Sequence, residues 1–134
     1  MASRRVKQVL ITNVKTDPPM RKGKMIAQAC HASIAFLTRS IGENWDREIE
    51  PRRIWDEATR IWMVEGFTKI GLQVDSEEAL RELYDKAQDA GLKAYLIVDS
   101  GETEFNGRPT ATCLAIGPDY SDEIDKITGN LKLL

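Results

Sequence analysis

The feature that most constrains the fold of this chain is a pair of almost continuous apolar runs, residues 92–98 (LKAYLIV) and residues 110–116 (TATCLAI). Apolar runs of this length are typical of strands that lie inside a sheet and are covered on both faces. We therefore expect residues 92–98 to form an interior strand and residues 110–116 to form another buried strand. Residues 6–14 are apolar and β-branched, and residues 67–74 alternate apolar and polar side chains, so two more strands are expected.

Four segments with helical character alternate with these strands. Their alternation predicts an α/β fold, in which a single domain over residues 1–134 holds one sheet with α-helices on both faces. The third helix has two competing N-caps, which are Asp75 paired with Glu78, or Ser76. The last four residues, LKLL, either add a short strand or only cover apolar surface. The expected helices span residues 23–39, 51–65, 76–90 and 121–128, and residues 40–50 are expected to form a loop.

Charge is distributed unevenly along the chain. Residues 1–24 hold seven basic side chains and one acidic side chain, whereas the rest of the chain is acidic and the net charge is −2. A positive patch on an acidic body can direct a polyanion to one face, and a charged terminus without special function has the same composition. No segment has the roughly 20 apolar residues of a membrane span, and Cys30 and Cys113 lack the spacing of a metal site. We therefore expect a soluble, cytoplasmic protein.

One face of the first helix carries the candidate chemistry. Lys24, Gln28 and His31 are spaced at i, i+4 and i+7, so they share a face. Residues 21–23 (RKG) form the helix entrance, where unpaired amides and the positive end of the helix dipole favour a phosphate or a developing oxyanion. Two alternatives remain open at this point, which are a polar helix edge that only faces solvent and a hydrogen-bonded, structural His31.

Other chemistries lack a basis in the sequence. His31 is the only histidine of the chain, which excludes metal sites that need two histidines. Cys30 precedes His31 directly, but adjacent residues of a helix point about 100° apart and do not face each other. The sequence contains neither a P-loop nor a GxGxxG motif, so nucleotide binding through those motifs is not indicated. One further residue is a candidate: Asp99 directly follows the expected strand 92–98, so it lies at the carboxyl end of that strand.

The first helix and its entrance resemble a known family. Met20-Arg21-Lys22-Gly23-Lys24, followed by Ala27-Gln28 and His31-Ala32, is similar to the motif MGKGKxAAQxxHA of the archaeal and eukaryotic type of peptidyl-tRNA hydrolase. The similarity continues in the same order through most of the chain, apart from residues 41–66. The further matches are residues 69–83 (KIGLQVDSEEALREL), 95–103 (YLIVDSGET, against LIxDAGRT), 114–118 (LAIGP) and 124–133 (IDKITGNLKL).

This resemblance implies a compact α/β domain with a four-stranded mixed sheet. It also implies hydrolysis of the ester that joins a peptide to the 3′-terminal ribose of tRNA. By motif, the proposed catalytic residues of the family fall on Lys24, Asp99, Thr103 and, across a difference of one residue in length, Thr112. The partner is then peptidyl-tRNA, no cofactor or metal is required, and a homodimer is expected. The residues expected to bind substrate are Arg21, Lys22, Gly23, Gln28 and His31.

Five positions depart from the family pattern. The largest change is at Glu102, where the family has arginine, because it reverses the charge beside the proposed site. The departures leave open an alternative function, a hydrolase-like protein that binds RNA, a small ligand or a protein partner without this reaction. A second open point is the helical stripe of Trp55, Ala58 and Trp62, which is either core or a dimer interface. The departures are Arg21, Phe67, Ser100, Glu102 and Asn130, in place of glycine, glutamine, alanine, arginine and histidine.

Overall fold

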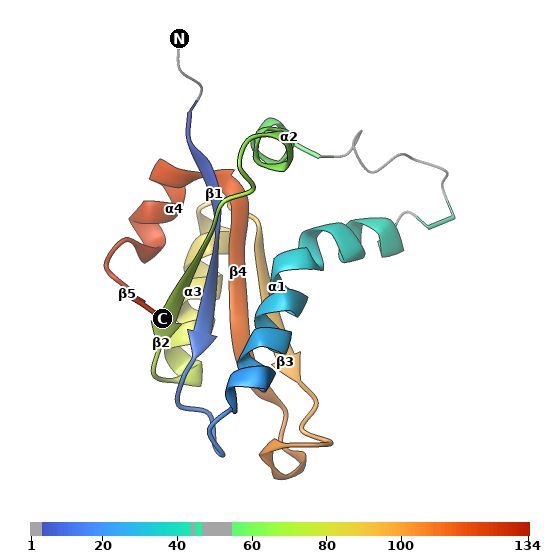
Figure 1. Cartoon of the computed structure of the whole chain (residues 1–134), viewed down its shortest axis with the longest axis vertical. Helices are drawn as coiled ribbons and strands as arrows, with labels where there is room; N and C mark the ends of the chain where they lie inside the picture. The colour runs from blue at the N-terminus through green and yellow to red at the C-terminus, as the bar shows by residue number, and fades with distance from the viewer. Residues whose placement is uncertain (1–3, 44, 47–54) are drawn as a thin grey trace.

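The computed structural model describes residues 4–43, 45–46 and 55–134. Within them, one sheet is covered by helices on both faces, which confirms the predicted α/β fold (Figure 1). The expected helix start at Pro51 and the first apolar contact of that helix, Ile54, lie outside the described residues. The elements are β1 (Val6–Asn13), α1 (Lys22–Glu43), α2 (Glu57–Val64), β2 (Lys69–Val74), α3 (Glu77–Asp89), β3 (Ala94–Asp99), a 3-10 turn (Phe105–Gly107), β4 (Thr110–Tyr120), α4 (Ser121–Thr128) and β5 (Lys132–Leu133).

The sheet is mixed and its strands follow the order β3-β4-β1-β2-β5. β1 and β2 are parallel, whereas β4 pairs antiparallel with both β1 and β3, and β5 pairs antiparallel with β2. The longest strand is β4, with 11 residues, and only its last residue, Tyr120, is not fully buried. β4 therefore lies in the middle of the core, between the two helix layers.

Alternation along β4 decides which helices cover which face. Leu114 and Ile116 pack in one apolar cluster with α3 and α4, whereas Cys113 and Ala115 pack against Ala32 of α1. Ala32 is fully buried, and its small side chain lets α1 lie close to the sheet. Figure 1 shows the result, with α1 in front of the sheet and α3 behind it.

The aromatic stripe of α2 belongs to the core. Trp62 is 0% exposed and Ala58 is 2% exposed. The Trp62 ring meets Phe36 of α1 edge-on at 5.7 Å, and its indole N–H donates to the carbonyl of Thr68 at 2.7 Å. Trp55, which is partly buried, contacts the same Phe36 at 6.0 Å. The core alternative is therefore confirmed for Trp62 and Ala58.

The expectation of a four-stranded sheet is wrong, because β5 adds a fifth strand. Leu133 pairs with Leu72, and the amide of Leu134 donates to the carbonyl of Gly71 at 3.1 Å. Both residues of β5 are exposed, so the strand has no alternation of buried and exposed side chains. β5 is defined by its main-chain hydrogen bonds alone, and these leave no pattern of apolar and polar side chains from which the strand could be predicted.

The expectation that residues 92–98 form an interior strand is also wrong, because β3 lies at an edge of the sheet. Helices α1 and α3 contact its two faces, which explains its apolar composition. Its free edge leaves Val98 45% exposed. An apolar run reports that both faces are covered, but it does not report whether a neighbouring strand lies on each side.

Two helix boundaries refine the sequence-based expectations. α1 extends to Glu43, so the expected loop is wrong for residues 40–43, where an exposed helix surface has the polar composition of a loop. Ser76 is the cap of α3, because its hydroxyl accepts a hydrogen bond from the amide of Ala79 at 3.0 Å. Ser76 rather than Asp75 therefore satisfies an amide of the first helical turn.

Candidate active site

Three segments that are far apart in the sequence meet at one end of the sheet. The first turn of α1, the carboxyl end of β3 and the loop of residues 100–109 lie together at the bottom of Figure 1. β1 and β3 are both antiparallel to β4, so their carboxyl ends share this edge. The chain after β1 then returns as α1, which places the helix entrance beside Asp99.

Lys24 and Asp99 form an ion pair at this junction. The Lys24 ammonium donates to Asp99 Oδ2 at 2.5 Å, and the two side chains are 19% and 14% exposed. The hydrogen bond from Lys24 is the largest influence that lowers the pKa of Asp99 below its ordinary value of 3.8, and the amide of Gly101 contributes further. Asp99 is therefore a carboxylate at neutral pH, held against a cation.

Gly101 contributes a contact that the sequence analysis missed. Its amide donates to Asp99 Oδ1 at 2.8 Å, so each carboxylate oxygen has its own donor. Gly101 has φ +83°, and a Cβ at this position would lie 2.5 Å from the carbonyl oxygen of Arg108. The glycine of the matched segment YLIVDSGET was the available signal, since only glycine fits this conformation and this close approach.

Gln28 and Thr112 form the buried side of the site. The Gln28 side-chain amide donates to Thr112 Oγ1 at 2.9 Å and lies 3.4 Å from Asp99 Oδ2. Both residues are nearly inaccessible, at 3% and 0% exposure. Ile97 pairs with Cys113 and Val98 pairs with Ala111, so Thr112 is the extra residue of a β-bulge. Because of the bulge, Thr112 and Cys113 both contact α1 despite being neighbours in a strand.

The entrance of α1 is strongly basic. The amide of Met25 donates to the carbonyl of Arg21 at 3.0 Å, and the preceding helical amides, at Lys22, Gly23 and Lys24, have no hydrogen-bond acceptor among the described residues. No acidic residue lies in this turn, and Arg21 and Lys22 are exposed without an ion-pair partner among the described residues. Cations at the positive end of a helix dipole are unfavourable unless an anion joins them.

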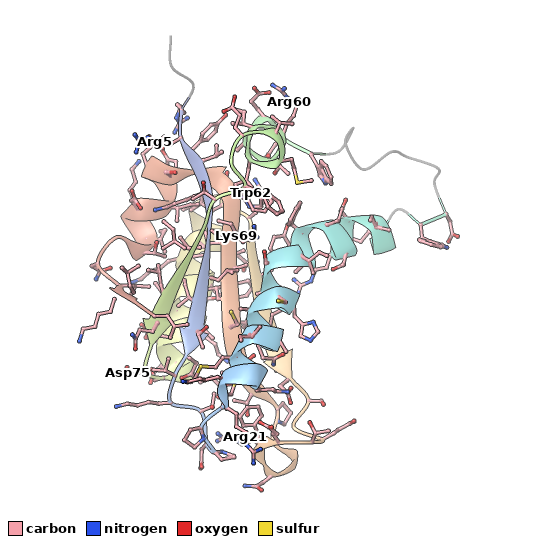
Figure 2. All side chains as sticks on the ribbon, in the orientation of Figure 1. Arg5, Arg21, Arg60, Trp62, Lys69 and Asp75 are labelled. Atoms are coloured by element: carbon pink, nitrogen blue, oxygen red, sulfur yellow. The ribbon has the colours of Figure 1, made fainter. Side chains whose placement is uncertain are left out.

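Thr103 lies on a neighbouring cavity of about 550 Å³. Gly101, Glu102 and Arg21 line the same cavity, and Figure 2 shows Arg21 at this end of the molecule. Thr103 is exposed, and its side chain makes no hydrogen bond to Lys24 or Asp99 within the part of the chain that the structure describes. The structure therefore brings Lys24, Gln28, Asp99 and Thr112 together, and it places Thr103 and Arg21 beside them.

His31, Phe67 and Asn130 occupy separate positions, and Glu102 is not paired with Lys24. His31 is exposed on α1, and its charge lowers the pKa of Asp99 less than the hydrogen bonds from Lys24 and Gly101 do. The Phe67 ring packs against Trp62 at the opposite end of the sheet, with 4.2 Å between the ring centroids and a tilt of 40°, and Asn130 lines a hollow beside β2. Lys24 pairs with Asp99, and no ion pair joins it to Glu102 among the described residues.

The described residues offer neither a metal site nor a membrane-spanning helix. They contain no group of three or more histidine, cysteine, aspartate or glutamate side chains with the geometry of a metal site. Among them, no helix has the length and apolar character that crossing a membrane requires.

Comparison with known proteins relates the whole chain to one family. The sequence profile of the family described as peptidyl-tRNA hydrolase PTH2 matches residues 6–134. A peptidyl-tRNA hydrolase of Methanothermobacter thermautotrophicus is 42% identical over 129 residues, which cover 96% of this chain and 100% of that protein. A peptidyl-tRNA hydrolase of Sulfolobus acidocaldarius is 39% identical, over 90% of this chain and 95% of that protein.

A eukaryotic relative and a solved structure extend the comparison. A probable peptidyl-tRNA hydrolase 2 of Dictyostelium discoideum is 37% identical over 95% of this chain, which corresponds to 54% of that longer protein. A solved structure of a protein of unknown function from Agrobacterium tumefaciens strain C58 has a TM-score of 0.52, with 14% identity, over 96% of this chain and 97% of that chain. At this identity the likeness concerns the fold alone.

Proposed function

The chain belongs to the peptidyl-tRNA hydrolase PTH2 family, and we propose that it uses Lys24 and Asp99 as catalytic residues to hydrolyse peptidyl-tRNA to free peptide and free tRNA. The observation that carries this assignment is their ion pair, which is largely withdrawn from solvent and lies beside the unpaired amides of α1. Ester hydrolysis needs a group that positions water and a cationic or hydrogen-bonding group for the oxyanion, and the Asp99 carboxylate and the Lys24 ammonium are suited to these two tasks.

Lys24 is the group suited to the oxyanion. When water adds to the ester carbonyl, negative charge develops on the carbonyl oxygen. A lysine ammonium has three N–H donors, and the hydrogen bond to Asp99 uses one of them. The other two have no acceptor among the described residues and can donate to the oxyanion, and the low exposure of the pair strengthens the electrostatic attraction relative to bulk water.

Asp99 is the group suited to the water. As the water oxygen bonds to the carbonyl carbon, Asp99 accepts one water proton, and collapse of the intermediate breaks the bond between that carbon and the ribose oxygen. The proton then passes to the ribose oxygen, so that tRNA leaves with a hydroxyl group. The lowered pKa makes Asp99 a weak base. Its larger contribution is therefore to orient the water and to hold Lys24.

The remaining site residues have positioning and binding roles in this proposal. Gln28 holds Asp99 from the buried side and is itself held by Thr112. Thr103 contacts the substrate from the adjacent cavity. The residues that meet the tRNA end are Arg21, Lys22, Gly23 and His31, all of which are exposed around α1.

The alternative of binding without the reaction is not favoured by any observation on the described residues. That alternative would be supported if Glu102 neutralised Lys24, but Lys24 pairs with Asp99. Relatives with 37–42% identity are named as peptidyl-tRNA hydrolases or as a probable one. We therefore retain hydrolysis as the function.

We also propose tRNA binding, cytoplasmic action and a homodimer. Exposed Arg21 and Lys22 support tRNA binding, because phosphate contacts are made by such side chains. For the dimer, Ile26 and Ile34 are 65% and 48% exposed and lie two helical turns apart on α1. Sedimentation equilibrium checks the dimer, since a species of only 15.1 kDa at micromolar concentration would contradict it.

The test of the catalytic proposal is release of tRNA from purified peptidyl-tRNA. Lys24→Ala and Asp99→Ala should each lower kcat by about 100- to 1,000-fold, since the first change removes an oxyanion donor and the second removes the group that orients and deprotonates the water. Lys86→Ala on α3, which removes an exposed lysine on the other face of the sheet, is the matched control and should retain wild-type kcat. Unchanged turnover in Lys24→Ala would overturn the assignment, and circular dichroism would confirm that each variant is folded.

A further inference from the structure

The cavity next to the proposed catalytic pair has lining residues that the proposed chemistry does not use beyond Thr103 and Arg21. It has a volume of about 550 Å³, within the range of small-molecule sites, and it lies between the segment before α1 and the loop of residues 101–107. Gly101 connects the cavity to the catalytic pair, because it lines the cavity and its amide binds Asp99. A group bound in the cavity would therefore lie beside the ester.

The charges of the cavity do not suit a run of phosphates. Among the described residues, Arg21 is its one cationic lining residue, whereas Glu102 and Glu104 add two carboxylates. A stretch of tRNA backbone carries one negative charge per nucleotide and would be repelled by these carboxylates. The 3′-terminal nucleoside differs, because it has a phosphate on its 5′ side only and its 3′ oxygen carries the ester.

The chemistry of that nucleoside fits the lining residues. Its ribose retains a free 2′-hydroxyl, which is a hydrogen-bond donor next to the ester, and an ionised glutamate is a strong acceptor for such a group. Arg21 is suited to the single 5′ phosphate. Recognition of a ribose hydroxyl by an acidic side chain is also the solution used in dinucleotide-binding folds.

We propose that this cavity holds the 3′-terminal adenosine of the tRNA and that Glu102 selects its ribose by accepting a hydrogen bond from the 2′-hydroxyl. The inference rests on the proposed function and adds a residue that determines specificity. It also gives a reason for Glu102 where the matched motif has arginine. At this position the chain presents a hydrogen-bond acceptor, the Glu102 carboxylate, to the end of the tRNA, whereas the arginine of the family motif is a donor.

The loop geometry is compatible with a preformed site. The amide of Gly107 donates to the carbonyl of Gly101 at 2.9 Å and closes the loop. Phe105 is 2% exposed, so its side chain anchors the loop in the protein interior. Glu102 lies on the exposed part of the loop between these anchors.

Binding of nucleoside monophosphates tests the inference without hydrolysis. We expect AMP to shift the backbone NMR signals of Gly101 and Gly107 in the wild-type protein, and 2′-deoxy-AMP to bind about tenfold more weakly. Glu102→Ala should bind AMP about tenfold more weakly and lose the preference over 2′-deoxy-AMP, and Glu102→Gln should show an intermediate loss. Glu82→Ala, which removes an exposed glutamate from α3, is the matched control and should behave like the wild type.

Three outcomes would overturn the inference. These are an undiminished preference for AMP in Glu102→Ala, loss of the preference in Glu104→Ala but not in Glu102→Ala, and loop signals that respond to N-acetyl-dialanine amide instead of AMP. The last outcome would assign the cavity to the peptide. Absent hydrolysis with normal AMP binding would instead overturn only the proposed function, so the two failures are distinguishable.

Discussion

The two ends of the sheet carry basic residues from the same short stretch of sequence but use them in different ways. Where β1 begins, Arg4 and Lys7 form ion pairs with acidic side chains of α4, at 2.8 Å and 2.6 Å. Beyond the end of β1, Arg21 and Lys22 are exposed without such partners among the described residues. Figure 2 shows Arg5 and Arg21 at opposite ends of the molecule.

This difference shows that the basic amino-terminal segment is not one patch. Strand β1 separates its two halves by the length of the sheet. At one end the charges stabilise the contact with α4, and at the other end they remain available to a polyanion. Lys7, one of the seven basic residues of this segment, is therefore not favoured as a contact of tRNA phosphates, because it is 14% exposed and paired with Asp125.

Among changes that leave the proposed catalytic side chains in place, the largest effect is expected from disturbing the main chain beside Asp99. Gly101→Ala should lower kcat about 100-fold, because the added Cβ would lie 2.5 Å from the carbonyl oxygen of Arg108 and the loop must move away from Asp99. Steady-state release of tRNA measures the effect. Gly42→Ala, with nothing within 4 Å of the added Cβ, is the control. If Gly101→Ala keeps more than a third of wild-type kcat, the amide of Gly101 has no part in catalysis.

A smaller effect is expected from removing the unpaired cations. The double variant Arg21→Ala, Lys22→Ala should lower kcat/KM about tenfold at low salt. It should also reduce the slope of log affinity against log salt by about 1 to 2, because tRNA binding releases fewer counterions when fewer phosphates are contacted. Filter binding of tRNA at several salt concentrations measures the slope. The matched double variant Arg4→Ala, Arg5→Ala should leave it unchanged. Equal slopes for both pairs would show that the ends do not differ.

The ion pair at the Asp99 end of the sheet should make stability depend on pH. The folded-state pKa of Asp99 is lowered from 3.8, so this group stabilises the fold above the unfolded-state value and loses that contribution as the pH falls through the folded-state value. We expect Asp99→Asn to unfold more easily than the wild type at pH 7, with the difference shrinking below about pH 3.8. Urea titrations at pH 7, 5 and 3 check this. A difference that grows towards acid would contradict it.

The smallest effect is expected at the opposite end. Lys7→Ala removes one ion pair whose acidic partner, Asp125, is 55% exposed, and solvent screening leaves such a pair about 0.5 kcal/mol of stability. Chemical denaturation measures this loss, and kcat and KM should stay within twofold of the wild type. A tenfold rise in KM would place tRNA on this end of the sheet and remove the contrast.

Local patterns in the sequence predicted most of the fold because they record which side chains are buried. The alternation in residues 69–74 and the helical spacing in α3 correspond to elements of the structure. The same patterns misplaced β3, since a strand covered on both faces has one composition whether it is central or at an edge. They also did not decide whether the last four residues form a strand, because both residues of β5 are exposed.

The sequence predicted which residues form the candidate site, but it predicted only some of the contacts between them. The stripe of Lys24 and Gln28 follows from helical spacing, and both side chains do contact Asp99. Thr112 was reachable only through resemblance to a family, because its contact with Gln28 depends on a β-bulge. Gly101 lies within a matched segment, but its contact with Asp99 depends on its positive φ, which cannot be read from the sequence.

By itself the sequence determined the alternation of strands and helices, the amphipathic first helix and the family to which the chain belongs. These properties depend on neighbouring residues, whose spacing sets which faces are apolar. Only the tertiary structure decided which cations are paired with carboxylates and which remain exposed. Lys24 and Asp99 are 75 residues apart and Lys7 and Asp125 are 118 apart. Such distant charges pair according to the order and direction of the strands, which no local pattern specifies.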